Sequence, residues 1–176
     1  MTRAAKWIAI TVVTASILAG TGCSSARAQM VYSIDGEVTT INQVVAVTDS
    51  CNLALKGRET VSLPWVINAM IQSDLAHRVA KAEAIVYDEQ TDLRDHLRAG
   101  DLTPQGQAMM GDPVCADVAT GLALKTLVIN QINTGGYEVA ARKFTVAVNP
   151  RFGQWDTAQL TVSGTGSLSH LDTPGG

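Results

Sequence analysis

The chain has 176 residues, a net charge of −3 at pH 7 and 46% hydrophobic residues. Its charges are mixed and no basic face stands out, so the composition argues against a nucleic-acid-binding protein. Once an export signal at its start is set aside, about 150 residues remain, enough for one domain with a hydrophobic core.

Residues 1–22 have the pattern of a bacterial lipoprotein signal peptide. Arg3 and Lys6 form a positive region, and residues 7–18 (WIAITVVTASIL) form an apolar segment that is too short to span a bilayer. Residues 18–23 (LAGTGC) resemble a lipobox, although Gly20 stands where an aliphatic residue is usual. We therefore expect Cys23 to be lipidated (palmitate) and to anchor the protein outside the cell membrane, followed by a tether over residues 23–29.

An alternative cleavage site lies a few residues further on. The segment 26–28 (ARA) is an A-x-A site, and cleavage there would release a secreted protein that starts at Gln29.

The two remaining cysteines, Cys51 and Cys115, form an even pair in an oxidising compartment. A disulfide between them would close a loop of about 64 residues and contribute roughly 4 kcal/mol in the chain-entropy description. The alternative is two buried thiols.

The first elements are a strand and a helix. Residues 31–34 are predicted to form a short strand that ends at the turn dipeptide Asp35-Gly36. Thr40 and Gln43 have the spacing of a capping box. They are predicted to start a helix that ends near Gly57. Its repeating face comprises Ile41, Val44, Val45, Thr48, Cys51 and Leu55, so Cys51 is expected to face the core.

A long helix is predicted over residues 62–86. Ser62 is a suitable N-cap, and Pro64 lies in the first turn, where no hydrogen bond is lost. One face of this helix carries an apolar residue every three or four positions. These residues are Ile67, Ile71, Leu75, Val79, Ala82 and Val86.

The next segments are less regular. Thr91 is predicted to cap a short helix that turns Leu93 and Leu97 to the core, and residues 101–112 are predicted to be mostly loop because they contain Pro104 and two glycines. A further helix is predicted to start after Asp112 and to end before Gly135. Its apolar stripe comprises Cys115, Val118, Leu122, the stem of Lys125, Ile129 and Ile132.

The chain ends with one more helical turn over residues 137–142 and an alternating strand over residues 143–148 (KFTVAV). Residues 163–176 are predicted to be a disordered tail. Two lone strands at opposite ends of a compact domain most simply pair with each other. We therefore predict a mostly α (α+β) domain over residues 30–162, with four to five helices and a two-stranded sheet that joins the two ends.

No motif in the sequence indicates catalysis. His77, His96 and His170 have no partner at metal-ligand spacing, and the chain contains no nucleophile elbow, phosphate loop or C-x-x-C pair. We therefore expect no enzymatic activity, no metal and no cofactor.

Two motifs resemble a known family. Residues 33–44 (SIDGEVTTINQV) resemble the opening of SurA-like and PrsA-like chaperone domains, except that Thr39 replaces an aliphatic residue. Residues 148–155 (VNPRFGQW) are similar to the V-N-P-R-[YF]-G-x-W ending of such domains in actinobacterial lipoproteins. The resemblance covers about residues 30–156. It implies a helical peptide-binding domain whose first and last strands pair, without the parvulin isomerase domain for which no segment is free.

The resemblance implies a cell-envelope lipoprotein that binds unfolded or partner polypeptides during export and folding. An adaptor lipoprotein that binds one specific envelope partner is the alternative, and a carrier of small ligands is a third. Candidate peptide-binding residues are Trp65, at the start of the long helix, and the Met109-Met110 pair, because methionine adapts to varied partners. All three could instead fill the core. The sequence leaves the client and the oligomeric state open.

Overall fold

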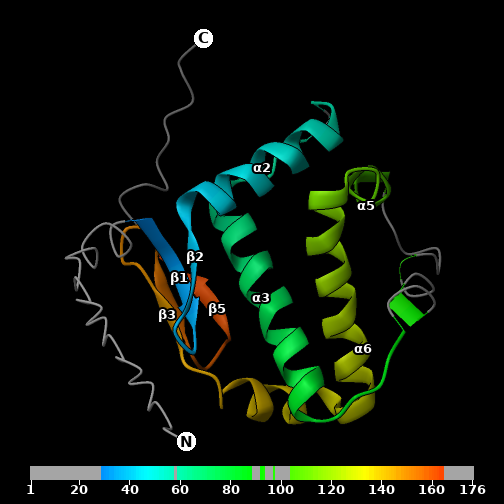
Figure 1. Ribbon diagram of the computed structural model, residues 1–176, viewed down its shortest axis with the longest axis vertical. Coiled ribbons are helices and arrows are strands. Elements are labelled where there is room, and N and C mark those ends of the chain that lie inside the picture. The colour runs from blue at the N-terminus through cyan, green and yellow to red at the C-terminus, as the bar shows by residue number, and fades with distance from the viewer. Residues whose placement is uncertain (1–28, 58, 89–91, 94–96, 98–103, 165–176) are drawn as a thin grey trace, which may run out of the picture.

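A computed structural model describes residues 29–57, 59–88, 92–93, 97 and 104–164. As predicted, the fold is mostly helical, with α2 (Ile41–Leu55), α3 (Leu63–Ala82), α5 (Pro104–Met109) and α6 (Pro113–Ala141). The strands are β1 (Met30–Ile34), β2 (Glu37–Thr40), β3 (Val146–Val148), β4 (Gln154–Asp156) and β5 (Thr161–Ser163). The strands lie on one side of α3 and α6 lies on the other (Figure 1).

The predicted pairing of the two end strands is confirmed. β1 and β3 are antiparallel, with Ser33 opposite Ala147. Just beyond β3, the Asn149 N–H donates to the Val31 carbonyl at 2.8 Å, and the Asn149 side-chain amide donates to the Met30 carbonyl at 2.9 Å. The beginning and the end of the domain are therefore held together by backbone pairing and by one asparagine.

The sheets are larger than predicted. β2 pairs with the other edge of β1, which makes a three-stranded sheet in the order β2-β1-β3, and β4 pairs with β5. Asp35 and Gly36 both have positive φ angles (51° and 86°), as a two-residue type I′ hairpin requires. The prediction missed β2 because it is only four residues long and its last residue is also the N-cap of α2.

The helix starts agree with the predicted caps. The Thr40 N–H donates to Gln43 Oε1 at 2.8 Å, which is half of a capping box. The Ser62 hydroxyl accepts from the Trp65 N–H at 3.4 Å. Asp112 accepts from two backbone N–H groups at 3.0 Å each. These side chains satisfy N–H groups that have no partner inside a helix.

α3 ends before the predicted residue. Ala84 has a φ of 51°, and the Ile85 N–H donates back to the Ala80 carbonyl at 2.8 Å, which is how a Schellman-type helix end is closed. Ala82 and Val86 were predicted to face the core, which is wrong: Ala82 is exposed and Val86 is 91% exposed. The last turn of the apolar pattern therefore lies outside the helix.

The segment between α3 and α6 agrees with the prediction only in part. Most of residues 91–103 lie outside the described residues, but Leu93 and Leu97 are buried as predicted. The predicted loop over residues 101–112 contains the helix α5, so that prediction was wrong. Pro104 stands at the first position of α5, where a missing N–H costs nothing, so this proline starts a helix and does not break one.

α6 is bent near its C-terminal end. Asn133 has non-helical angles (φ 58°, ψ 170°), and its Oδ1 accepts from the Gly136 N–H at 3.0 Å, so this side chain caps the final segment. The predicted extra turn after Gly136 is this segment.

Within the described part of the chain, α6 is the one helix that is long and apolar enough to cross a membrane. Its buried residues Leu124 and Val128, however, belong to a core cluster with residues of α3.

α3 and α6 approach closely at one point. An ideal Cβ placed on Gly121 would lie 1.7 Å from Ser73 Oγ and 3.0 Å from Ser73 Cα. Glycine is therefore required there for the two helices to pack at this distance.

The predicted disulfide joins Cys51 of α2 to Cys115 of α6. A separate core cluster surrounds it and includes Leu55 and Met109.

The disulfide generates a first prediction. Replacing Cys51 and Cys115 together by alanine releases a constraint across 64 residues, and we expect the free energy of unfolding to fall by about 2–4 kcal/mol. Urea unfolding followed by circular dichroism measures this change. The unmutated protein in reductant should lose a similar amount, and equal stability of all three samples would contradict the prediction.

The helix crossing generates a second prediction. Gly121→Ala should destabilise the fold by about 1–3 kcal/mol, because Ser73 and its backbone must move. Gly136→Ala is the matched control in the same helix, since its new Cβ would meet Ile132 at an ordinary 3.4 Å. The control should be neutral or more stable by up to about 1 kcal/mol. Thermal unfolding of both variants compares them, and equal effects would contradict the assigned contact.

Candidate functional site

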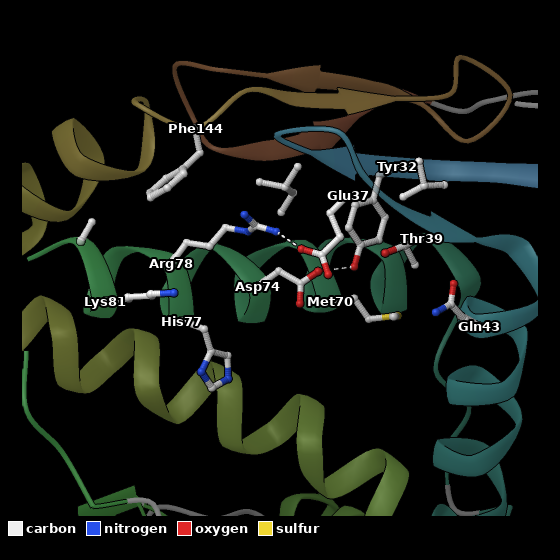
Figure 2. Close-up of a pocket in the computed structure, with 13 residues that line it drawn as sticks. Tyr32, Glu37, Thr39, Gln43, Met70, Asp74, His77, Arg78, Lys81 and Phe144 are labelled. Carbon is white, nitrogen blue, oxygen red and sulfur yellow. Dashed lines mark hydrogen bonds and ion pairs between the residues drawn. The ribbon is translucent and has the colours of Figure 1, made fainter. Parts of the chain in front are cut away.

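A groove lies between the β1–β2 hairpin and α3. It encloses about 960 Å³, and we call it the β2 groove (Figure 2). Its wall on the sheet side is formed by β1 and β2, its other wall by the exposed face of α3, and its ends by the start of α2 and the residue Phe144. The lining residues are Tyr32, Ile34, Glu37, Val38, Thr39, Gln43, Met70, Asp74, His77, Arg78, Lys81, Ala82 and Phe144.

A smaller groove lies on the other flank of the same helix. It encloses about 390 Å³ between α2, α3 and α6, and we call it the α6 groove. Both grooves are lined by Met70, Asp74 and His77. Together with Lys81, these residues recur every three or four positions, so they form one stripe along α3. Next to this stripe, Ile71 and Leu75 are buried in a core cluster with Tyr32 and Ile34 of β1.

A buried tyrosine and a carboxylate meet in the middle of the β2 groove. The Tyr32 hydroxyl donates to Asp74 Oδ2 at 2.7 Å, and Tyr32 is only 1% exposed. Burial and the adjacent Asp74 carboxylate raise the pKa of Tyr32 above its ordinary value. Burial also raises the pKa of Asp74, although the hydrogen bond from Tyr32 and the charge of Arg78 act in the opposite direction.

An arginine connects the hairpin to α3. The Arg78 guanidinium donates to the Glu37 carboxylate, and its Nη1 lies 3.8 Å from Asp35 Oδ2. Figure 2 shows this ion pair next to the Tyr32–Asp74 hydrogen bond. The two contacts hold the turn end of the hairpin against α3. Because Arg78 is already shared between two carboxylates, its charge is largely neutralised within the protein.

The two ends of the β2 groove differ in charge. At the C-terminal end of α3, Lys81 forms no ion pair within the described part of the chain, and His77 Nδ1 lies 3.2 Å from the Tyr87 hydroxyl. At the opposite end lie the neutral side chains of Thr39, Gln43 and Met70 (Figure 2). The end near Lys81, which we call the basic end, therefore carries a cation without an ion-pair partner among the described residues, beside the ion pairs of Arg78, and the other end is uncharged.

β2 is an edge strand that opens onto this groove. The sheet order places β1 on one side of β2 and no described strand on the other. Ile34 and Glu37 flank the two-residue turn, so the alternation of antiparallel pairs makes Ser33 and Val38 a non-hydrogen-bonded pair. Val38, which is 43% exposed, therefore directs its N–H and C=O away from β1.

The residues predicted to bind peptide lie elsewhere. Trp65 is 41% exposed at the start of α3, whereas Met109 is 9% exposed and packs beside the disulfide. Met110 is half-buried in the turn after α5. None of the three lines either groove, and they do not form one surface.

Cys23, His96 and His170 lie outside the described residues. Over the described ranges, no three side chains of histidine, cysteine, aspartate or glutamate are grouped to hold a metal ion. Sequence reasoning missed the groove itself, because Tyr32 and Asp74 are 42 residues apart. The available signal was the polar stripe beside the apolar face of the long helix.

The Tyr32–Asp74 contact generates a third prediction. Folding raises the pKa of Asp74 above its ordinary value of 3.8. At a pH between the unfolded and the folded pKa, the folded protein therefore binds more protons than the unfolded chain. Stability from this group is fully present below the ordinary value and is lost as the pH rises through the folded pKa. Asp74→Asn removes this titration. The stability of the unmutated protein minus that of Asp74→Asn should therefore decrease from pH 3.5 to pH 7.

Urea unfolding at several pH values measures this difference, with Asp49→Asn on the exposed side of α2 as the control. A difference that is independent of pH, or one that increases with pH, would show that the pKa of Asp74 is not raised by folding.

Comparison of the chain with protein-family models, with curated proteins and with solved structures finds no match. The resemblance to SurA-like and PrsA-like domains therefore stays a hypothesis based on two motifs, and the assignment of a function rests on the geometry of the grooves.

Proposed function

We propose that this domain binds extended polypeptide segments in the β2 groove and serves as a chaperone-like module of the cell envelope, without isomerase activity. The observation that carries the proposal is the outer edge of β2, which pairs with no described strand and lines a groove of about 960 Å³. An extended segment that enters such a groove can add a strand to the sheet, because main-chain hydrogen bonds do not depend on the sequence of the segment.

Val38 supplies the main-chain contact. In antiparallel addition its N–H and C=O would both bond to one residue of the bound segment, as in a closely spaced pair. Side chains of the segment would then alternate between the groove and solvent. Those that enter the groove would meet Met70 and the half-buried ring of Phe144.

The character of the lining favours a peptide over a small apolar ligand. Small-ligand sites are lined predominantly by apolar and aromatic side chains with a few polar groups. The β2 groove instead places Glu37, Asp74 and Arg78 at its centre. Polar groups in this number suit a main chain with its own donors and acceptors, and the flexible Met70 accommodates different side chains.

The test removes one hydrogen-bond donor from the edge of β2. Val38→Pro deletes an N–H that points away from β1, and proline is tolerated in an edge strand at such a position. Val38→Thr is the matched control, because it keeps the N–H and the branched shape. Binding of a fluorescein-labelled, reduced and carboxymethylated lactalbumin, which stays unfolded, is measured by anisotropy. Val38→Pro should weaken binding by at least about threefold, and Val38→Thr should not.

Circular dichroism and thermal unfolding must show that both variants are folded. Equal binding by the two variants would remove the β2 edge from the mechanism, and absence of binding by the unmutated protein at several-fold molar excess would overturn the proposed function. A stoichiometric complex with one folded envelope protein, together with indifference to the unfolded probe, would establish the adaptor alternative.

A further inference from the structure

The basic end of the β2 groove has a charge that no described residue neutralises. Arg78 is paired with Glu37 and Asp35, and Lys143 is paired with Glu83 at 3.0 Å. Lys81, one helical turn beyond Arg78 on the same helix, has no such partner and is exposed. His77 lies one turn before Lys81 on the stripe that faces the groove (Figure 2). A carboxylate of a bound segment would complement this end.

The direction of a bound segment follows from the directions of β2 and α3. Glu37, at the start of β2, contacts Arg78, so the Lys81 end of the groove is the turn end of the hairpin. β2 runs from that end towards Thr40 and Gln43. A segment that is antiparallel to β2 therefore runs towards Lys81. Its C-terminal side reaches the basic end of the groove, and its N-terminal side lies near the uncharged end.

The dimensions set an approximate spacing. Along β2, Glu37 lies one residue, about 3.4 Å, from Val38. Glu37 contacts Arg78, and Lys81 lies three residues, about 4.5 Å, further along α3. The sum of about 8 Å corresponds to two or three residues of an extended chain. A carboxylate two or three residues after the residue paired with Val38 would therefore reach Lys81.

We propose that the β2 groove selects extended segments that carry a carboxylate on their C-terminal side, which Lys81 binds while the segment lies antiparallel to β2. This inference rests on the proposed function. The carboxylate can be the terminus of the segment or an acidic side chain, and both have the same chemistry at Lys81. Reversing the direction of the segment would place its carboxylate at Thr39 and Gln43, where no cation of the groove lies.

The test uses labelled octapeptides of alternating threonine and valine. One peptide ends in a free carboxylate and one in an amide. Two further amidated peptides carry glutamate near the C-terminal or near the N-terminal end. Anisotropy at low salt and at 0.15 M salt measures their affinities. The free-acid peptide and the peptide with C-terminal glutamate should bind about two- to fivefold more tightly than the plain amide. The N-terminal glutamate should give no gain, and salt should reduce the preference.

Two variants assign the preference to Lys81. Lys81→Met should abolish the preference, and Lys81→Glu should reverse it. Lys56→Met, which removes an exposed cation outside both grooves, should leave the preference intact. If only the free acid is preferred, the groove recognises chain ends, whereas a preference for the C-terminal glutamate alone indicates acidic side chains. Either result supports the proposal.

The outcomes separate the inference from the function on which it rests. If no octapeptide binds and the unfolded lactalbumin does not bind either, the proposed function fails. If the peptides bind but their affinity does not depend on the carboxylate, or if the preference survives in Lys81→Met, only the inference is overturned. Sedimentation velocity of the protein alone tests whether a second copy of the chain occupies the groove. A dimer that dissociates in Lys81→Glu would show this and overturn the inference.

Discussion

The pairing of β1 with β3 is the interaction on which the groove depends. β3 occupies one edge of β1 and β2 occupies the other, so β2 is left as an outer strand beside α3. Asn149 reinforces this pairing with two hydrogen bonds to the first strand. Because these contacts join residues about 115 positions apart in the sequence, β2 takes its place beside α3 only when both ends of the domain have come together.

α3 performs two separate tasks with its two faces. Its apolar face packs in the core, where Ser73 meets Gly121 of α6 at a distance that excludes any larger residue. Its polar stripe faces the hairpin through Asp74 and Arg78. The first strand of the hairpin also packs on this helix through apolar residues, since Tyr32 and Ile34 share a core cluster with Ile71 and Leu75.

The sequence allowed those parts of the fold to be predicted that depend on local or strongly patterned signals. The caps at Thr40, Ser62 and Asp112 each depend on residues within three positions, and the disulfide was predicted because Cys51 and Cys115 remain as a pair once Cys23 is set aside. The short strands β2, β4 and β5 have too few residues to show a period, and they form because neighbours pair with them. The site was missed for a related reason. The pairing of Tyr32 with Asp74 gives no signal in the sequence, because the two residues meet only through tertiary contact.

The outer edge of β2 is short, and this limits how tightly the proposed groove could hold an extended segment. Thr40 begins α2, and its N–H is already bonded to Gln43, so the capping box that starts the helix also ends the usable edge of β2. Val38 is then the residue that offers both backbone groups between the turn and the helix. A net contribution of about 1 kcal/mol per hydrogen bond gives weak binding from so short an edge. Weak, main-chain-based contact is appropriate for holding many exported chains briefly, whereas a permanent partner needs a larger interface of roughly 1,200–2,000 Å². This difference is why the geometry favours a chaperone-like module over an adaptor.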